Sequence, residues 1–383
     1  MRFPNNKDKT RIEVSRSALL GNIATFRKVA GKKTEVAAVV KANAYGHGLP
    51  EVVQILKRAK VKVFCVDNID EAEEIREIDK SSTVIILGYT TLANIKRAVE
   101  DDISFVVYNI ESLRKIVALN SGRKAKIHIK TETGLNRQGA SKKELIKLLS
   151  FIKKHKDKID FEGISSHFAN VEDTLDPAYP MSQLKRFDEA VKVVKSKGFK
   201  PPFVHCAASA AALLYKEAAF SLIRVGIGLY GLWPSRETKI ALSLKKKSIK
   251  LIPALAWKSI IAQVKNIGEG ESVGYGRTWF SSRKSKVAIV PVGYSDGLDR
   301  KLSSSGNILV KGKLAPIIGR VAMNMITVDV TDIPGVKTED EVVIIGKSIG
   351  KTITAEEMAD KIDTINYEVV SRINPLIPRI VIK

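Results

Sequence analysis

The sequence predicts a (β/α)8 TIM barrel followed by a C-terminal mainly-β domain, and three observations lead to this fold class. Short apolar runs alternate with segments of helical periodicity from Val36 to Val225. Beyond Leu242, strand-like runs follow one another with almost no helix between them. Lys41 ends the first apolar run before a glycine-bearing turn, and the active sites of barrels lie at the C-terminal ends of their strands. We therefore expect a barrel domain over residues 1–241 and a β domain over residues 242–383.

A helix is predicted first, at Ser17–Val29. Apolar strand-like runs follow at Val36–Lys41, Val61–Val66, Thr83–Leu87, Ser104–Tyr108, Ala125–Lys130, Phe161–Ser166, Phe203–Ala207 and Leu222–Val225. Helical periodicity marks the segments between most of them, at Glu51–Ala59, Ile69–Ile78, Leu92–Val99, Glu111–Leu119, Lys142–His155, Gln183–Lys197 and Ala208–Lys216. Alternation of this kind is typical of a parallel barrel.

The later part of the chain is predicted to form strands with turns between them. The strand-like runs are Ala254–Val264, Lys286–Val292, Asn307–Val310, Ile326–Val330 and Glu341–Ile345. One short helix is expected at Ala355–Lys361, with Thr354 as its N-cap and Glu356 and Glu357 in its first turn. This pattern favours a separate β domain.

Composition excludes several classes of protein. With 383 residues and 44% apolar content the chain can bury a sizeable core, and no uninterrupted apolar stretch is long enough to span a membrane. The opening MRFPNNKDKTR lacks the apolar core of a signal peptide, so we expect a cytoplasmic protein with no membrane partner. Cys65 and Cys206 fit no zinc spacing, which favours reduced core residues and no metal. The net charge of +23 is spread along the chain without a nucleic-acid-binding signature, so no nucleic-acid partner is expected.

Lys41 is the residue that points most directly to chemistry. The preceding AAVV is short and apolar, as a strand buried on both faces is. A desolvated ε-amino group loses its proton more readily and can then attack a carbonyl to form a Schiff base. Tyr45 follows with a phenol, and Gly46 and Gly48 lack a Cβ, so that the backbone there can approach a ligand.

Other candidate residues stand at or after the later strands, where they would converge on the same mouth of the barrel. They are Arg137, His167, Ser209, Arg224, Gly226 and Ile227. A hydroxyl and backbone N–H groups at such turns favour a phosphate. Lys130, inside an apolar strand, would be a costly buried cation unless it is modified or paired.

The decamer VVKANAYGHG around Lys41 resembles the lysine motif of alanine racemases, which use pyridoxal 5'-phosphate (PLP). TETGLNR and SSHFAN resemble further segments of that family, as do ESVGYGRTW, PVGYSDG, PIIGRVAMNM and TINYEVVSRI in the β domain. The similarity covers the chain from Glu13 to Val381. It implies a homodimeric fold-type III enzyme in which the β domain of one subunit closes the barrel mouth of the other. The implied activity is the interconversion of L-alanine and D-alanine, which supplies D-alanine for peptidoglycan.

The resemblance also implies how the two bases and the cofactor are arranged. Lys41 would bind PLP and act on D-alanine, while Tyr275 of the partner subunit would act on L-alanine in a two-base mechanism. Arg224 would hydrogen-bond the pyridine nitrogen of PLP, and His167 would position Arg224. The phosphate would be held by Tyr45, Ser209, Gly226, Ile227 and Tyr367.

Substrate binding is implied in the same way. Arg137 and the backbone near the partner's Met323 would receive the substrate carboxylate. Carbamylation of Lys130, common in the family, would create an anion that holds Arg137. Two positions depart from the family pattern: Ala208 replaces an asparagine on the phosphate side, and Asn324 replaces an aspartate near the entrance.

Three alternatives to an alanine racemase stay open at the level of sequence. A non-catalytic PLP-homeostasis protein shares the barrel but normally lacks the β domain. A fold-type III decarboxylase has both domains but would not be expected to show ESVGYGRTW or RVAMNM. A basic interaction protein would bind heparin without absorbing visible light. Serine is the next substrate after alanine, because pocket walls discriminate only weakly between small side chains.

Overall fold

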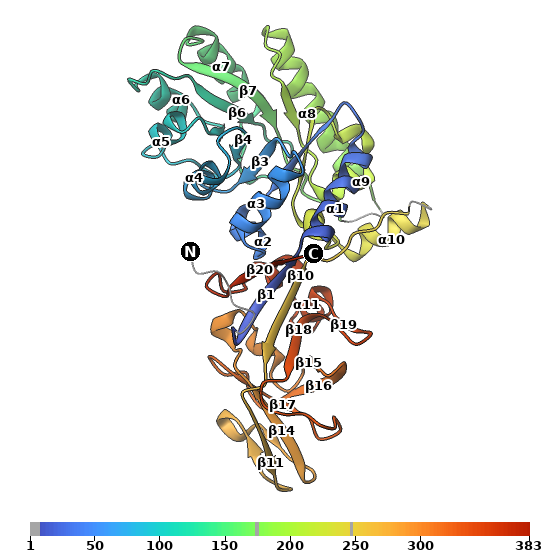
Figure 1. Ribbon diagram of the computed structural model, residues 1–383. Helices are drawn as coiled ribbons and strands as arrows, with labels where there is room; N and C mark the ends of the chain where they lie inside the picture. The colour runs from blue at the N-terminus through green and yellow to red at the C-terminus, as the bar shows by residue number, and fades with distance from the viewer. Residues whose placement is uncertain (1–7, 173–175, 246–247) are drawn as a thin grey trace. The chain divides into compact units, whose positions relative to one another are not determined.

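The protein is described here by a computed structural model that covers residues 8–172, 176–245 and 248–383 (Figure 1). The chain forms two compact units. The barrel unit comprises Ser17–Ala44 and Val52–Pro253, and the β unit comprises Tyr45–Glu51, Ala254–Lys383 and the segment that ends at Arg16. Two stretches of the range 1–241, which the sequence assigns to the barrel, thus lie in the β unit. Residues 1–7, which open the segment used to judge a signal peptide, lie outside the described residues.

The barrel unit contains an 8-stranded parallel sheet in the order β8-β7-β6-β5-β4-β3-β2-β9. Its strands are β2 (Glu35–Val39), β3 (Val63–Val66), β4 (Thr83–Ile86), β5 (Ser104–Val107), β6 (Ala125–Lys130), β7 (Ile159–Ser165), β8 (Phe203–His205) and β9 (Leu222–Val225). The two edges of the sheet meet, because Ser221 N donates to Val204 O (3.2 Å) and Arg224 N to Ala207 O (3.0 Å). This arrangement confirms the predicted TIM barrel.

Helices connect the strands of the barrel unit, as Figure 1 shows. They are α1 (Arg16–Ala30), α2 (Lys41–Tyr45), α3 (Leu49–Arg58), α4 (Ile69–Ile78), α5 (Ile95–Glu100), α6 (Ile110–Val117), α7 (Lys142–Lys154), α8 (Ala178–Ser196), α9 (Ser209–Leu214) and α10 (Arg236–Leu244). Short polar side chains begin several of them. Asn68, Asn109 and Ser141 each accept a backbone N–H in the first turn of α4, α6 and α7.

The strands of the barrel are buried almost throughout, as parallel strands covered on both faces must be. Cys65 and Cys206 are free and buried, which confirms that they are core residues. Burial raises the pKa of each thiol to about 12. Among the described residues, no helix combines the length and apolar character needed to cross a bilayer.

The β unit is built on a 10-stranded sheet in the order β11-β14-β17-β16-β15-β18-β10-β1-β20, with β19 paired to β18. A separate ribbon pairs β12 with β13. The strands are β1 (Thr10–Ser15), β10 (Leu255–Ile260), β11 (Gln263–Ile267), β12 (Ser272–Val273), β13 (Trp279–Phe280), β14 (Ser285–Val290), β15 (Asn307–Val310), β16 (Lys313–Ile318), β17 (Ile326–Asp329), β18 (Glu341–Ser348), β19 (Lys351–Ile353) and β20 (Arg379–Ile382). The blue strand β1 in Figure 1 pairs with the gold strand β10 on one side and with the red strand β20 at the end of the chain on the other.

Two helices complete the β unit, α11 (Ala355–Ile362) and α12 (Asn366–Ser371). The first confirms the predicted helix and its cap. Thr354 Oγ1 accepts the N–H of Glu357 (3.0 Å), and the Glu357 carboxylate accepts the N–H of Thr354 (2.9 Å), which makes a capping box.

The predicted single strand at Ala254–Val264 is wrong, because β10 ends at Ile260 and β11 begins at Gln263. The reason is a change of partners. Ile261 N donates to Asp340 O (3.0 Å), whereas Ala262 N donates to Ile289 O (2.8 Å). The chain therefore leaves one neighbouring strand for another within two residues, and no glycine or proline in the sequence marks the change.

Candidate active site

Lys41 lies just past the last residue of β2 and begins a turn of left-handed helix. Ala42, Asn43 and Ala44 have φ values of 53°, 52° and 52°, and Tyr45 has a φ of 53°. Each L-residue in this conformation costs about 1–2 kcal/mol, and such strain is concentrated at functional sites. The strained turn therefore marks Lys41 as a position that the surrounding structure holds in place.

The side chain of Lys41 differs from the expected desolvated amine. It is 41% exposed, and its Nζ lies 3.5 Å from Asp67 Oδ1. The difference arises because the buried segment ends at Val40, and the Lys41 side chain in the next position reaches solvent. The predicted location at the mouth of the barrel stands, whereas the predicted burial of the amine was wrong for the isolated chain.

Several positive side chains gather at this end of the barrel. Lys130 is buried, and its Nζ donates to Gln138 Oε1 (3.2 Å). Burial, together with the charges of Arg224, Arg137 and Lys41, lowers the pKa of Lys130 to about 8. Each of these groups therefore lies within electrostatic range of Lys130. A site with this excess of positive charge fits an anionic ligand such as a phosphate or a carboxylate.

His167 belongs to the same cluster. Burial lowers the pKa of His167 to about 3, and the charge of Arg224 adds to the effect. Arg224 Nη2 donates to His167 Nδ1 (3.2 Å), so the ring is neutral and carries its proton on Nε2. The expectation that His167 contacts Arg224 agrees with this geometry.

Arg224, on β9, is buried and held from several sides. Its Nη2 donates to the carbonyl oxygens of Ser166 (2.8 Å) and Cys206 (3.1 Å), and its Nη1 donates to His205 Nδ1 and to the His205 carbonyl (3.1 Å). Burial lowers the pKa of Arg224 from its ordinary value. Its Nε takes part in none of the hydrogen bonds that Arg224 makes with described residues. That N–H is therefore the donor that a ring nitrogen of PLP could use.

A chain of buried histidines continues from Arg224 into the barrel. Because a guanidinium can only donate, His205 Nδ1 is an acceptor and the His205 proton lies on Nε2. His205 Nε2 lies 2.9 Å from His128 Nδ1 and donates to it, which leaves the His128 proton on Nε2. Burial lowers the pKa of His128 to about 3 and holds that of His205 well below its ordinary range, and Arg224 contributes to both shifts.

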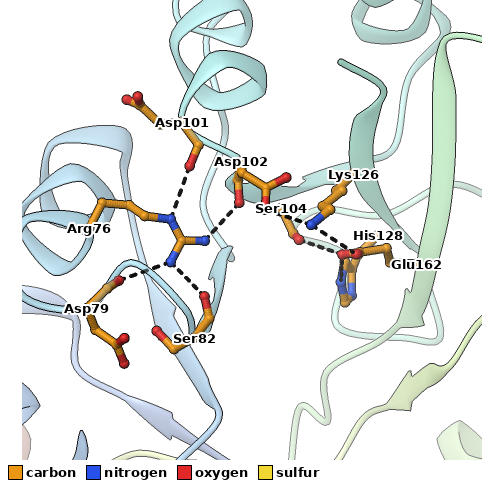
Figure 2. A network of polar contacts seen from close by, with 9 residues as sticks. All are labelled: Arg76, Asp79, Ser82, Asp101, Asp102, Ser104, Lys126, His128 and Glu162. Atoms are coloured by element: carbon orange, nitrogen blue, oxygen red, sulfur yellow. Dashed lines mark hydrogen bonds and ion pairs between the residues drawn. The ribbon is translucent and has the colours of Figure 1, made fainter.

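Figure 2 shows where this chain of histidines ends. His128 Nε2 lies 3.9 Å from Glu162 Oε2, which accepts the hydroxyl of Ser104 (2.5 Å). Burial raises the pKa of Glu162. The polar chain thus runs from Arg224 through two neutral imidazoles toward a carboxyl group, and it fixes one tautomer for each ring.

Ser209 and the turn after β9 are brought together as predicted for a phosphate. Ser209 Oγ accepts the N–H groups of Gly226 (3.1 Å) and Gly228 (3.3 Å). Ile227 begins the following 3₁₀ turn and is buried. The Gly226 N–H thus already donates to Ser209. The hydroxyl of Ser209 is left to donate a hydrogen bond to an oxygen of a phosphate.

Tyr45 and Tyr367 also lie together, both in the β unit, with ring centroids 6.3 Å apart. The glycine after Tyr45 has a structural reason. A Cβ on Gly46 would lie 1.9 Å from Val370 O, and one on Gly48 would lie 2.2 Å from Glu51 Oε2. Packing within the β unit therefore explains why these two positions lack a Cβ, and the approach of a ligand to their backbone stays a prediction.

Tyr275 stands at the tip of the β12–β13 ribbon and is 75% exposed. Both of its neighbours, Gly274 and Gly276, have positive φ values, of 77° and 74°. The Gly-Tyr-Gly pattern is therefore required by the backbone of the loop that presents this side chain.

The remaining candidates of the β unit are also exposed. Met323 is 55% exposed, and its carbonyl oxygen accepts the N–H (3.0 Å) and the hydroxyl (2.9 Å) of Ser295. Asn324 Nδ2 donates to Ser295 Oγ (2.7 Å). The asparagine that replaces the family's aspartate therefore makes a hydrogen bond as a donor, which an aspartate carboxylate could not do. Ala208 precedes α9 and makes no side-chain cap hydrogen bond there.

Sequence reasoning missed two features of this site. His205 was not singled out, although it binds Arg224, because nothing in FVHCAA distinguishes it from a satisfied core histidine. The left-handed turn was missed because Asn43 is the only one of its four residues that favours a positive φ angle, while alanine and tyrosine disfavour it. The position of His205 at the end of a strand is a weak signal, because satisfied core histidines also stand there.

Comparison with known proteins extends these observations over both units. The family model for "Alanine racemase, N-terminal domain" matches residues 14–234, and that for "Alanine racemase, C-terminal domain" matches residues 254–381. An alanine racemase of Leptospira interrogans is 41% identical over 374 residues, which are 97% of this chain and 95% of the relative. An alanine racemase of Methanococcus maripaludis is 36% identical over 371 residues, with 96% and 97% coverage.

Solved structures agree. Alanine racemase from Bacillus anthracis with bound L-Ala-P has a TM-score of 0.92 at 32% identity, over 100% of this chain and 96% of that one. Alanine racemase from Streptomyces lavendulae has a TM-score of 0.90 at 30% identity, over 100% and 98%. A match to both domains favours a racemase over the three alternatives. The chain therefore belongs to the alanine racemase family of isomerases.

Proposed function

We propose that this protein is a PLP-dependent alanine racemase that works with two bases and supplies D-alanine for peptidoglycan. The observation that carries the proposal is Lys41 at the mouth of the barrel, on a strained left-handed turn. Its charge acts on Lys130 and His167, as the charges of Arg137 and Arg224 also do. The family match supports PLP as the group that Lys41 binds. The cluster of positive charge fits the phosphate of PLP and the carboxylate of an amino acid.

The residues of the barrel unit would hold the cofactor. Arg224 offers its Nε–H to the pyridine nitrogen, and a permanent positive charge there keeps a proton off that nitrogen. His167 and His205 hold the guanidinium in place. The hydroxyl of Ser209, with the turn at Gly226 and Ile227, would receive the phosphate. When bound, PLP supplies an electron-withdrawing ring that lowers the barrier to removal of the α-hydrogen.

Racemisation requires a proton carrier on each face of the substrate. Lys41 Nζ removes the α-proton of D-alanine or returns it, and the phenol of Tyr275 does so for L-alanine. Tyr275 would come from the partner subunit in a homodimer, which accounts for its exposure in the isolated chain. Arg137 and the backbone near the partner's Met323 would receive the substrate carboxylate. Tyr45 and Tyr367 would complete the phosphate site.

Carbamylation of Lys130 is a further part of the proposal. The lowered pKa of about 8 leaves a useful fraction of the buried amine neutral near neutral pH, and only a neutral amine takes up CO2. The resulting anion would replace repulsion between Lys130 and Arg137 with attraction. This change of sign is what would fix Arg137 at the substrate carboxylate.

The proposal is tested with the purified protein and its Lys41→Ala variant. The wild type should absorb visible light when PLP is added, lose that band on treatment with borohydride, and racemise alanine faster than serine. Lys41→Ala should lose the band. Its rate of alanine racemisation should fall by about 10⁴-fold or more, the upper end of what a general base typically contributes. A wild-type protein that binds PLP but leaves L-alanine unchanged would refute the proposal. Lys153→Ala, an exposed residue of α7, is the control and should behave as wild type.

A further inference from the structure

The left-handed turn after Lys41 needs an explanation that the two bases do not provide. Ala42, Asn43 and Ala44 all have left-handed φ and ψ values, and none is a glycine. A backbone of this kind relaxes unless other groups hold it, because each Cβ lies close to the following carbonyl oxygen. The direction in which Lys41 leaves the strand depends on this turn.

One side chain holds the start of the turn from outside. Glu71 lies in the first turn of α4, where its own N–H donates to the N-cap Asn68 (3.0 Å). Its Oε1 accepts the N–H of Ala42 (2.6 Å), and its Oε2 accepts the N–H of Asp67 (2.9 Å). A single carboxylate therefore joins the loop after β2 to the loop after β3.

The second loop carries the charged neighbour of Lys41. Asp67 Oδ1 lies 3.5 Å from Lys41 Nζ, but the two side chains are 56% and 41% exposed. An ion pair this exposed is weak, because water screens it and both side chains must be ordered. The two amide hydrogen bonds to Glu71 are charge-assisted and short, and they act on the backbone directly. Backbone contacts thus fix Lys41 more firmly than its ion pair does.

We propose that Glu71 is a positioning residue for Lys41: its carboxylate bridges the amides of Ala42 and Asp67 and so holds the left-handed turn that directs the lysine. The inference rests on the proposed role of Lys41 as a base. A carboxylate is required because both of its oxygens accept. A glutamine keeps the length but turns an NH2 group toward one of the two N–H donors.

The test compares Glu71→Gln with Glu77→Gln, an exposed residue of the same helix whose change removes the same charge. In the full-length protein, with and without PLP, amide hydrogen exchange should speed up at Ala42 and Asp67 in Glu71→Gln alone, by about tenfold or more. The kcat should fall by about 10–100-fold with little change in KM, since small displacements of a reacting group cost this much. Melting temperatures of the two variants should agree.

A double variant separates positioning from general support of α4. Glycine adopts positive φ without steric cost, and Ala42 is exposed, so Ala42→Gly should relieve the turn without removing packing. Added to Glu71→Gln, it should restore part of the lost kcat. If Glu71 only stabilised α4, this glycine would restore nothing, and that result would overturn the inference.

Two further outcomes are decisive. Glu71→Gln with exchange and kcat equal to those of Glu77→Gln would overturn the inference, even in an active racemase. Suppose that exchange at Ala42 and Asp67 is faster in Glu71→Gln but the wild-type protein proves inactive on alanine. The bridge from Glu71 to the two amides would then be supported, and the proposed function would be refuted. If Glu71→Gln fails to fold, Glu71→Asp takes its place, because its shorter side chain cannot reach both amides.

Discussion

In the barrel unit Arg224 is buried and bound by His167, His205 and three carbonyl oxygens, whereas in the β unit Tyr275 is 75% exposed at the tip of a ribbon. The first side chain is fixed by contacts that the barrel unit makes with itself. For Tyr275, the two flanking glycines with positive φ fix the backbone, but no hydrogen bond or ring contact with a described residue fixes the side chain. A change at Arg224's partners should therefore cost stability, while a change at Tyr275 should cost activity alone.

The largest expected effect is on the exposed side. Tyr275→Phe removes only a phenolic proton carrier, so racemisation should slow by about 10²–10⁴-fold or more in both directions, because each direction needs both faces. The free energy of unfolding should change by less than about 0.5 kcal/mol, as for other surface substitutions. Urea unfolding and racemase assays of the same preparation measure the two quantities.

Solvent deuterium exchange sharpens this result. In Tyr275→Phe, D-alanine should still exchange its α-hydrogen through Lys41 with retention, whereas exchange of L-alanine should nearly stop. Normal exchange of L-alanine with loss for D-alanine would reverse the assignment of faces. Unchanged racemisation would show that Tyr275 is not a base.

A change on the buried side should have the opposite character. His205→Asn removes the ring that accepts from Arg224 and donates to His128, which leaves buried polar groups without partners. Such groups cost about 1–3 kcal/mol, so the free energy of unfolding should fall by that amount. His155→Asn, at the C-cap of α7, is the control: it loses a ring contact with Phe151 but leaves no buried polar group without a partner, so it should cost less than about 1 kcal/mol. Equal stability of both variants would show that the hydrogen bonds of His205 do not stabilise the barrel unit.

Lys130 should make the stability of the barrel unit depend on pH. Its pKa in the folded chain is about 8, below the ordinary 10.5, so the folded state binds fewer protons between these values than the unfolded state. The free energy of unfolding should therefore rise as the pH increases from about 8 toward 10.5, by about 1–2 kcal/mol after allowance for solvent screening. Lys130→Met should lack this rise in carbonate-free buffer. A rise of the same size in the variant would assign it to other groups.

The smallest effect is expected at a local feature of the β unit. Thr354→Ala removes one half of the capping box of α11 and should cost about 1 kcal/mol in unfolding free energy without changing turnover. Thr352→Ala, at an exposed position of β19, has no cap to lose and should be nearly neutral. A loss of turnover in Thr354→Ala would show that α11 takes part in the site.

The barrel strands could be predicted because apolar runs such as Thr83–Leu87 and Ala125–Lys130 are buried on both faces and stand between helical segments. Strands β1 and β20 could not, because each depends on pairing with a strand far away in sequence. Ile12 pairs with Trp257 on one side and Arg379 on the other, and no local sequence pattern predicts these pairings. Tertiary pairing, rather than local preference, forms these strands.

The site was predicted better in position than in detail. Strand ends placed Lys41, His167 and Arg224 on one mouth because parallel strands present their C-terminal ends together. The exposure of Lys41 and the filled spaces beside Gly46 could not be foreseen, since they depend on which protein atoms arrive there. A motif gives the residue types of a site, but the backbone that carries them has to be observed.

If Lys41 and Tyr275 act on one substrate from different subunits, two inactive variants should restore activity when they are mixed. Lys41→Ala and Tyr275→Phe chains should be inactive alone. After subunit exchange at equal amounts, half of the dimers are mixed and each has one intact site, so about a quarter of the wild-type activity should return. No recovery, with exchange demonstrated by differently tagged chains, would contradict the account.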